Sequence, residues 1–211
     1  MNTISYLKEI YGYGVPIFLK DIRIGQKSKL SIRKDLSRGV ENGDICRESQ
    51  GIYYFDAKKD FPTVISFIDI IDKKYIGEKI LDSDIYFDVF GYYTGLSFLN
   101  QIGISQQVPA VIELVTNNTS CKRYITINGF KALVRKPKTL INNSNWKVLQ
   151  FLDSFYLLNA DDIKRHYKTI YEYKIKNIND KQINEYLCLY PKRTALLLTE
   201  LEVLNRYEHK W

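Results

Sequence analysis

The sequence predicts an α+β fold, with an N-terminal winged helix-turn-helix followed by a mixed α/β domain that has a small sheet and a C-terminal helical half. The first observation is that helix-like segments and then a hairpin signal fall within the first 56 residues. The second is the stretch 91–118, which reads as a helix, a glycine stop, a proline-containing loop and a strand. The third is helical periodicity towards the C-terminus. A polar junction at 57–60 gives the expected domains, residues 1–57 and 58–211, the second with a sheet part at about 78–136 and a helical part at about 143–211.

The composition indicates a folded protein of the cytoplasm. Of the 211 residues, 45% are hydrophobic and 26% are charged, which supports a core and argues against disorder. No apolar run approaches the roughly 18 residues of a membrane span, and the N-terminus lacks the apolar segment of a secretory signal. We therefore expect no membrane partner. Cys46, Cys121 and Cys188 are widely spaced, so we expect three reduced thiols rather than a metal cluster or disulfide framework.

The first domain begins with three expected helices. Residues 2–11 have apolar positions at helical spacing, with Asn2 or Thr3 as the cap, and an extended piece follows at 15–18. A second short helix is expected at 20–24. A third, at 28–42, has Ser28 as its cap and apolar residues every four positions.

Basic side chains gather on the opposite face of this third helix, and a hairpin with the turn Ser49-Gln50-Gly51 follows it. In a winged helix the third helix enters the DNA major groove and the hairpin touches the backbone. Lys and Arg neutralise phosphates and donate paired hydrogen bonds to guanine. The alternative is that this helix binds protein. The candidate DNA-binding residues are Lys27, Lys29, Arg33, Lys34, Arg38, Arg47 and Gln50.

The second domain starts with a helix expected from Pro62 to Tyr75, broken by Gly77. Residues 79–90 are mixed, and we expect a loop with a short strand or helical turn. In the stretch 91–118, Thr94 is the expected helix cap, Gly103 ends the helix, and a strand follows at 111–115.

A second hairpin is expected at 121–134, because Asn128-Gly129 is the strongest short hairpin signal. The formal net charge of the chain is +7, and residues 114–152 contribute a net +7 without one acidic side chain. Such a stretch suggests a surface that meets an anion, most simply phosphate, and the alternative is a solvated basic face without a partner. The candidate secondary basic surface is Lys122, Arg123, Lys131, Arg135, Lys136 and Lys138.

The remaining segments predict helices at about 144–155, 161–176, 180–190 and 192–207. Catalytic signatures are absent from the sequence, and the two histidines, His166 and His209, lack partners at metal-ligand spacing. The aspartates 82, 84 and 88 lack an EF-hand frame, so we interpret them as a solvated acidic loop. We expect neither an enzyme nor a metal or other cofactor.

The stretch 91–118 resembles the signature of the AbiEi-like antitoxins of type IV toxin–antitoxin and abortive-infection systems. The resemblance is carried by Gly91-Tyr92-Tyr93-Thr94-Gly95, Ser97-Phe98-Leu99-Asn100, Ile102-Gly103-Ile104-Ser105, Gln107-Val108-Pro109 and Glu113-Leu114-Val115-Thr116-Asn117. Segments 32–38 and 51–53 resemble the recognition helix and wing of the family. Gly39 stands where the family has a larger apolar residue, a change that costs a helix up to about 1 kcal/mol relative to alanine.

The resemblance implies an antitoxin of phage-defence systems that represses its own operon. It implies double-stranded promoter DNA and a nucleotidyltransferase-like toxin as partners. We expect a monomer or weak dimer, for which cooperative binding to DNA is one option. The motif residues it singles out are Thr94, Gly95, Asn100, Gly103, Gln107, Pro109, Thr116 and Asn117. Two alternatives remain, namely a transcription regulator whose second domain binds a ligand or protein, and a basic interaction module that does not repress.

Overall fold

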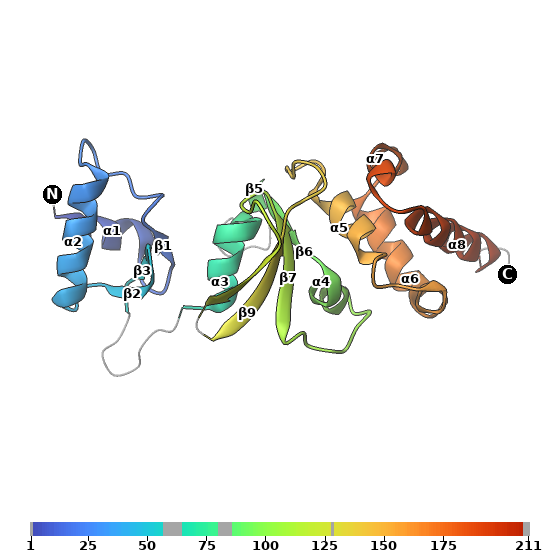
Figure 1. Cartoon of the computed structure of the whole chain (residues 1–211), viewed down its shortest axis with the longest axis horizontal. Coiled ribbons are helices and arrows are strands. Elements are labelled where there is room, and N and C mark those ends of the chain that lie inside the picture. The colour runs from blue at the N-terminus through green and yellow to red at the C-terminus, as the bar shows by residue number, and fades with distance from the viewer. Residues whose placement is uncertain (1, 57–64, 80–85, 128, 209–211) are drawn as a thin grey trace. The chain divides into compact units, whose positions relative to one another are not determined.

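The computed structural model describes residues 2–56, 65–79, 86–127 and 129–208. The fold is α+β, with helices and small sheets (Figure 1), and the chain divides into two compact units, Met1–Ile71 and Asp72–Trp211. This division falls later than the boundary expected after residue 57. The polar junction at 57–60 lies outside the described residues.

The first part of the N-terminal unit, residues 3–54, has helices α1 and α2 beside a three-stranded sheet (Figure 1). Helix α1 (Thr3–Tyr11) leads to strand β1 (Ile17–Phe18). Helix α2 (Lys29–Glu41) leads to a hairpin of β2 (Cys46–Ser49) and β3 (Ile52–Tyr54). The strands are antiparallel in the order β1-β3-β2, so the predicted first strand and hairpin are confirmed.

Helices α1 and α2 both start at the caps that the sequence predicts. The Asn2 side chain accepts a hydrogen bond from the Ile4 N–H at 3.0 Å, and Ser28 Oγ accepts one from the Ser31 N–H at 3.2 Å. Each cap satisfies a backbone donor that the first helical turn leaves free. The sequence therefore fixes where α2 begins and which of its faces meets the core.

One helix predicted for this unit is wrong. Residues 20–24 complete a turn that starts at Leu19 and then continue without helix, and the Asp21 N–H donates to the Phe18 carbonyl at 2.9 Å. Ile22 and Ile24 are both buried in the core of the unit, so apolar positions alternate here, as they do in extended chain. The Arg23 guanidinium donates to the Lys20 and Ile22 carbonyls and holds the turn.

Gly39 lies where α2 approaches α1 most closely. It is buried, and a Cβ atom there would lie 2.6 Å from Cδ1 of Ile4 and 3.1 Å from Cγ2 of Ile45. The core around it consists of Leu7, Ile17, Ile22, Ile24, Ile32, Leu36, Ile45, Tyr53 and Phe55. Close packing against Ile4 and Ile45 thus explains why Gly39 stands where the family that the sequence resembles has a larger apolar residue.

Helix α3 (Phe67–Ile71) runs directly into a π-helical turn, η1 (Asp72–Ile76). The expected helix from residue 62 is therefore confirmed only from Phe67 onward, and Pro62 lies outside the described residues. Gly77 ends it as predicted and starts β4 (Gly77–Lys79), which pairs antiparallel with β5 (Tyr86–Val89). The mixed stretch 79–90 thus contains a short strand.

A separate sheet has four strands, β6 (Gly91–Tyr93), β7 (Val111–Thr116), β8 (Arg123–Ile127) and β9 (Phe130–Arg135). Their order is β6-β7-β9-β8. The predicted hairpin is confirmed by antiparallel pairing of β8 with β9, and Gly129 has φ 78° in its turn, whereas Asn128 lies outside the described residues. The parallel pairing of β7 with β9 was not predicted.

Helices cover this sheet and continue to the C-terminus. Helix α4 (Gly95–Gln101) packs on β7, and Gly103, at φ 77°, follows its end as predicted. The later elements are α5 (Trp146–Ser154), α6 (Ala160–Asn177), α7 (Asp180–Tyr186), the 3₁₀ turn η2 (Leu187–Leu189) and α8 (Lys192–Glu208). The four helices predicted after residue 143 are thereby confirmed.

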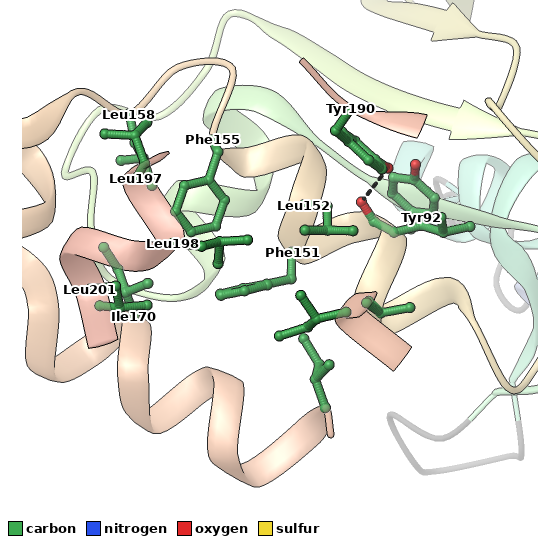
Figure 2. Close-up of a cluster of buried hydrophobic side chains, with 14 of the residues drawn as sticks. Tyr92, Phe151, Leu152, Phe155, Leu158, Ile170, Tyr190, Leu197, Leu198 and Leu201 are labelled. Carbon is green, nitrogen blue, oxygen red and sulfur yellow. Dashed lines mark hydrogen bonds between the residues drawn. The ribbon is translucent and has the colours of Figure 1, made fainter. Parts of the chain in front are cut away.

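One core joins the sheet to the C-terminal helices. Figure 2 shows its centre, where Phe151 of α5 and Phe155, which follows that helix, pack beside aliphatic side chains of α6 and α8. The two phenylalanine rings meet edge to face at 5.1 Å between centroids. Tyr92 of β6 and Val115 of β7 belong to the same core, so the helical half is not a separate domain. Within the described residues, no helix is both long and apolar enough to cross a membrane.

Candidate nucleic-acid interface

The solvent face of α2 carries three basic side chains, Arg33, Lys34 and Arg38. The opposite face buries Ile32 and Leu36, because the helical period of 3.6 residues separates the two sets. All three basic residues are exposed, and none forms a hydrogen bond or ion pair within the part of the chain that the structure describes. They are available to an anionic partner.

Lys27 differs from these three because its exposed side chain is bound by other residues of the unit. Its Nζ forms an ion pair with Asp35 Oδ2 at 3.0 Å and donates to Thr3 Oγ1 at 2.8 Å. The Thr3 hydroxyl also donates to Asp35. The Thr3 hydrogen bond and then that of Lys27 lower the pKa of the Asp35 carboxyl. This triad joins α1 to α2 and fixes the angle at which α2 is presented.

Lys29, Arg47 and Gln50 are the remaining candidate residues, one on α2 and two on the hairpin. Lys29 is the first helical residue and is exposed. Arg47 lies on β2, where its Nε donates to the Ser49 carbonyl at 3.4 Å, and Gln50 lies in the hairpin turn beside Gly51, whose φ is 80°. The seven candidate residues are thus all exposed, and Lys27 and Arg47 also have partners.

Leu30 is a residue of this face that the sequence reasoning missed. Its side chain is 63% exposed, although leucine normally lies inside. It precedes Arg33 by three positions and Lys34 by four, so the three side chains are neighbours on one helical surface. The available signal was an apolar residue outside the buried stripe of Ile32 and Leu36.

The candidate secondary basic residues do not form one surface. Lys122, Arg123, Lys131 and Lys136 are exposed, whereas Arg135 is half-buried. Lys131 and Arg123 point to opposite faces of the sheet, because Lys131 pairs with Thr126 and side chains alternate along β8. Lys138 lies over the rings of Tyr156 and Tyr190, at 5.5 and 5.0 Å from their centroids.

Arg135 faces a buried polar cluster that the sequence did not reveal. Its Nη2 donates to Thr94 Oγ1 at 3.4 Å. Asp153 of α5 is 4% exposed and accepts from the Tyr92 hydroxyl at 3.1 Å and from the Thr94 hydroxyl at 3.4 Å. The Tyr190 hydroxyl, close to that of Tyr92 in Figure 2, donates to the Leu149 carbonyl at 3.1 Å.

Burial dominates the electrostatics of this cluster. It raises the pKa of the Asp153 carboxyl, although the Arg135 charge and the Tyr92 hydrogen bond act in the opposite direction. Burial also raises the pKa of Tyr92 well above its ordinary value, and the Asp153 charge adds to this. The Arg135 guanidinium thus compensates a buried carboxyl, so this cluster has a structural role.

Most of the motif residues that carry the family resemblance stabilise the backbone around them. Thr94 lies at the start of α4, but its side chain makes no capping hydrogen bond. Its hydroxyl instead donates to Asp153 and accepts from Arg135. Gly95 has φ 61°, and a Cβ there would lie 2.8 Å from the Glu113 carboxylate. Asn100 donates to the Ser105 carbonyl at 3.0 Å.

The other motif residues divide between the sheet end and an exposed loop. Thr116 donates to the Phe90 carbonyl at 3.1 Å. Asn117 bridges the backbone of Ile141 through both its amide and its carbonyl, at 2.8 and 3.0 Å. Gln107 is exposed beside the half-buried Pro109. Of the eight motif residues, the side chain of Gln107 is therefore the one best placed to meet a partner.

Within the described ranges, no three His, Cys, Asp or Glu side chains converge to hold a metal ion. Asp88 of the acidic stretch is exposed, whereas residues 82 and 84 lie outside the described part. His166 lies at a kink inside α6, where its φ and ψ are −116° and 16°.

No family model, curated protein or solved structure matches this chain. The functional argument therefore rests on the geometry described above and on the sequence resemblance.

Proposed function

We propose that the chain binds double-stranded promoter DNA through a winged helix, with α2 in the major groove and the β2–β3 hairpin against the backbone. The observation that carries this is the solvent face of α2, where Arg33, Lys34 and Arg38 are exposed and form no hydrogen bond or ion pair within the described residues. Basic side chains on one helical surface match the phosphates and guanine edges of a groove.

The order of elements supports the winged-helix assignment. A helix, a strand, a turn, a second helix and a hairpin follow one another within residues 3–54. The turn at 20–24 replaces one helix of the usual layout, and the Thr3–Lys27–Asp35 triad joins the two helices that remain. A fixed α2 can enter a groove in one orientation, which sequence-specific binding requires.

We further propose that the protein is an antitoxin and autorepressor of a toxin–antitoxin operon, and that the second unit counteracts a nucleotidyltransferase-like toxin. This part rests on the resemblance of residues 91–118 to AbiEi-like antitoxins. Five of the eight motif residues support the backbone in turns, contacts or hydrogen bonds, namely Gly95, Asn100, Gly103, Thr116 and Asn117. Thr94 instead joins the buried cluster of Asp153 and Arg135. The loop with Gln107 and the 85% exposed Val108 offers a contact surface.

A gel-shift titration of the DNA upstream of the gene tests the first proposal. Lys34→Ala and Arg38→Ala should each weaken binding by about 1–3 kcal/mol where the side chain contacts a base, and less where it contacts a phosphate. Lys136→Ala, which removes an exposed charge from the other unit, is the matched control. Tight, specific binding that neither α2 change weakens would contradict the assignment of α2.

Co-expression with the adjacent gene tests the antitoxin proposal. A toxic neighbour that this chain neutralises supports it, and Gln107→Ala then shows whether the exposed loop contributes. A harmless neighbour, combined with specific DNA binding, favours the transcription regulator without a toxin partner. The scaffold roles of the motif residues are compatible with that second function.

A further inference from the structure

Leu30 is an apolar side chain on a face of α2 that is otherwise polar and basic. Its exposed fraction is 63%, and its neighbours on that face are Arg33, Lys34 and Ser37. Leucine is among the residues most often buried, so this side chain leaves apolar surface in water. The core of this unit is formed by other residues, since Ile32 and Leu36 of the same helix are buried.

The position of Leu30 within α2 points to a base rather than to the backbone. It lies in the first turn, after the Ser28 cap. In helix-turn-helix proteins, the N-terminal residues of the recognition helix contact base edges. Arg33 and Lys34 lie one turn later on the same surface, and their charges fit the phosphates and guanines that flank such a contact.

The chemistry of the groove identifies the apolar partner. The C5-methyl group of thymine is the apolar feature that an unmodified base pair presents in the major groove. An aliphatic side chain held between basic ones can cover this methyl group and remove its apolar surface from water. A water molecule or a charged group in the same place makes no such favourable contribution.

We propose that Leu30 selects thymine by covering its 5-methyl group in the major groove. This inference rests on the proposed DNA-binding function and adds the base that is preferred at one position of the DNA site. A thymine at that position should be preferred over deoxyuridine, which differs only by the methyl group. Burying one methyl-sized group predicts a preference of about fourfold.

The test begins with duplexes selected from a random pool by the full-length protein. Each thymine of the selected site is then replaced in turn by deoxyuridine, and affinities are measured for the wild type and for Leu30→Ala. The wild type should weaken about fourfold at one thymine in each bound site. The Leu30→Ala variant should bind thymine and deoxyuridine there equally, and Leu30→Met should restore part of the preference.

Ile10→Ala is the matched control, because Ile10 is a 55% exposed aliphatic residue of the same unit outside α2. It should keep the full methyl preference. Leu30 and Ile10 are both exposed, so the circular dichroism spectra of both variants should match that of the wild type.

Two outcomes overturn the inference while the proposed function stands. In the first, specific binding shows no methyl preference at any thymine. In the second, Leu30→Ala retains the wild-type preference. Failure to select any duplex would instead overturn both the proposed function and the Leu30 inference, so the two failures are distinguishable.

Discussion

The basic residues of α2 and those around β9 differ in what surrounds them, although both segments are positively charged. On α2, Arg33, Lys34 and Arg38 are exposed and form no hydrogen bond or ion pair within the described residues. Around β9, Arg135 faces a buried carboxyl and Lys138 lies over two tyrosine rings. Positive charge in a sequence thus indicates a binding surface only where folding leaves the side chains free. We therefore propose that α2 binds DNA, and we infer a structural role for Arg135 and Lys138.

The largest effect is expected from a change inside the sheet unit. An added Cβ at Gly91 would lie 1.8 Å from the Tyr75 carbonyl oxygen, a backbone atom that cannot swing away. Gly91→Ala should cost about 4 kcal/mol or more and prevent the second unit from folding normally. Thermal unfolding followed by circular dichroism measures this.

Gly43→Ala is the matched glycine change beside α2. Gly43 has φ 74° with nothing within 4 Å of a Cβ, so its cost should be only about 1–2 kcal/mol, from the left-handed backbone. Equal losses at the two positions would contradict the view that the sheet unit is the tightly constrained region.

Removing the half-buried arginine should give the next largest effect. Arg135→Ala leaves the buried Asp153 carboxyl without its main compensating charge, and should lower the free energy of unfolding by about 2 kcal/mol. Urea unfolding measures it. The neighbouring Lys136→Ala, at an exposed position, should stay within about 0.5 kcal/mol of the wild type. If Arg135→Ala weakens DNA binding without changing stability, the comparison between the two basic regions fails.

A smaller effect is expected at the contact between α1 and α2. Gly39→Ala gains helix propensity but pushes against Ile4 and Ile45, so we expect a net loss of about 1 kcal/mol. Thermal unfolding of the variant measures the change. A gain in stability would show that Ile4 moves aside freely and that glycine is not required there.

The smallest effect is the pH dependence of two carboxyls. The pKa of Asp35 is lowered, so its interactions stabilise the N-terminal unit above its ordinary pKa and are lost as the pH falls through the folded-state value. The pKa of Asp153 is raised by burial, so the stability gained from its protonated form is present at low pH and is lost as the pH rises through the folded-state value.

Carboxyl NMR titration should therefore show Asp35 releasing its proton at a lower pH than Asp153. Asp35→Asn and Asp153→Asn assign the two signals, and each removes its own contribution to the pH dependence. The reverse order of titration would contradict the contrast between the half-buried Asp35 and the buried Asp153.

Local chemistry made much of this fold predictable from sequence. The Ser28 cap, the glycine turns and the Asn128-Gly129 signal act over a few residues, and they correctly located α2 and both hairpins. The parallel pairing of β7 with β9 joins strands separated along the chain, and no short motif encodes such a partner. The turn at 20–24 was missed because a five-residue apolar pattern fits a helix or an extended segment.

The candidate site was predictable in part for the same reason. Helical periodicity identified the solvent face of α2, since it depends only on spacing within one element. Arg135 and Lys138 gave the same sequence signal as their exposed neighbours. Their partners, Asp153 and Tyr190, come from distant segments, so only the tertiary structure could separate structural from available charge.

The salt dependence of binding to the upstream DNA tests the central claim most directly. The triple variant Arg33→Ala, Lys34→Ala, Arg38→Ala is compared with Lys122→Ala, Lys131→Ala, Lys136→Ala, which removes the same charge from exposed positions of the other unit. The α2 variant should lose its preference for the upstream sequence, and its slope of log affinity against log salt should flatten by roughly two to three. The second variant should keep the preference. Equal losses in both variants, or retained specificity in the α2 variant, would contradict the assignment of α2 as the DNA-reading element.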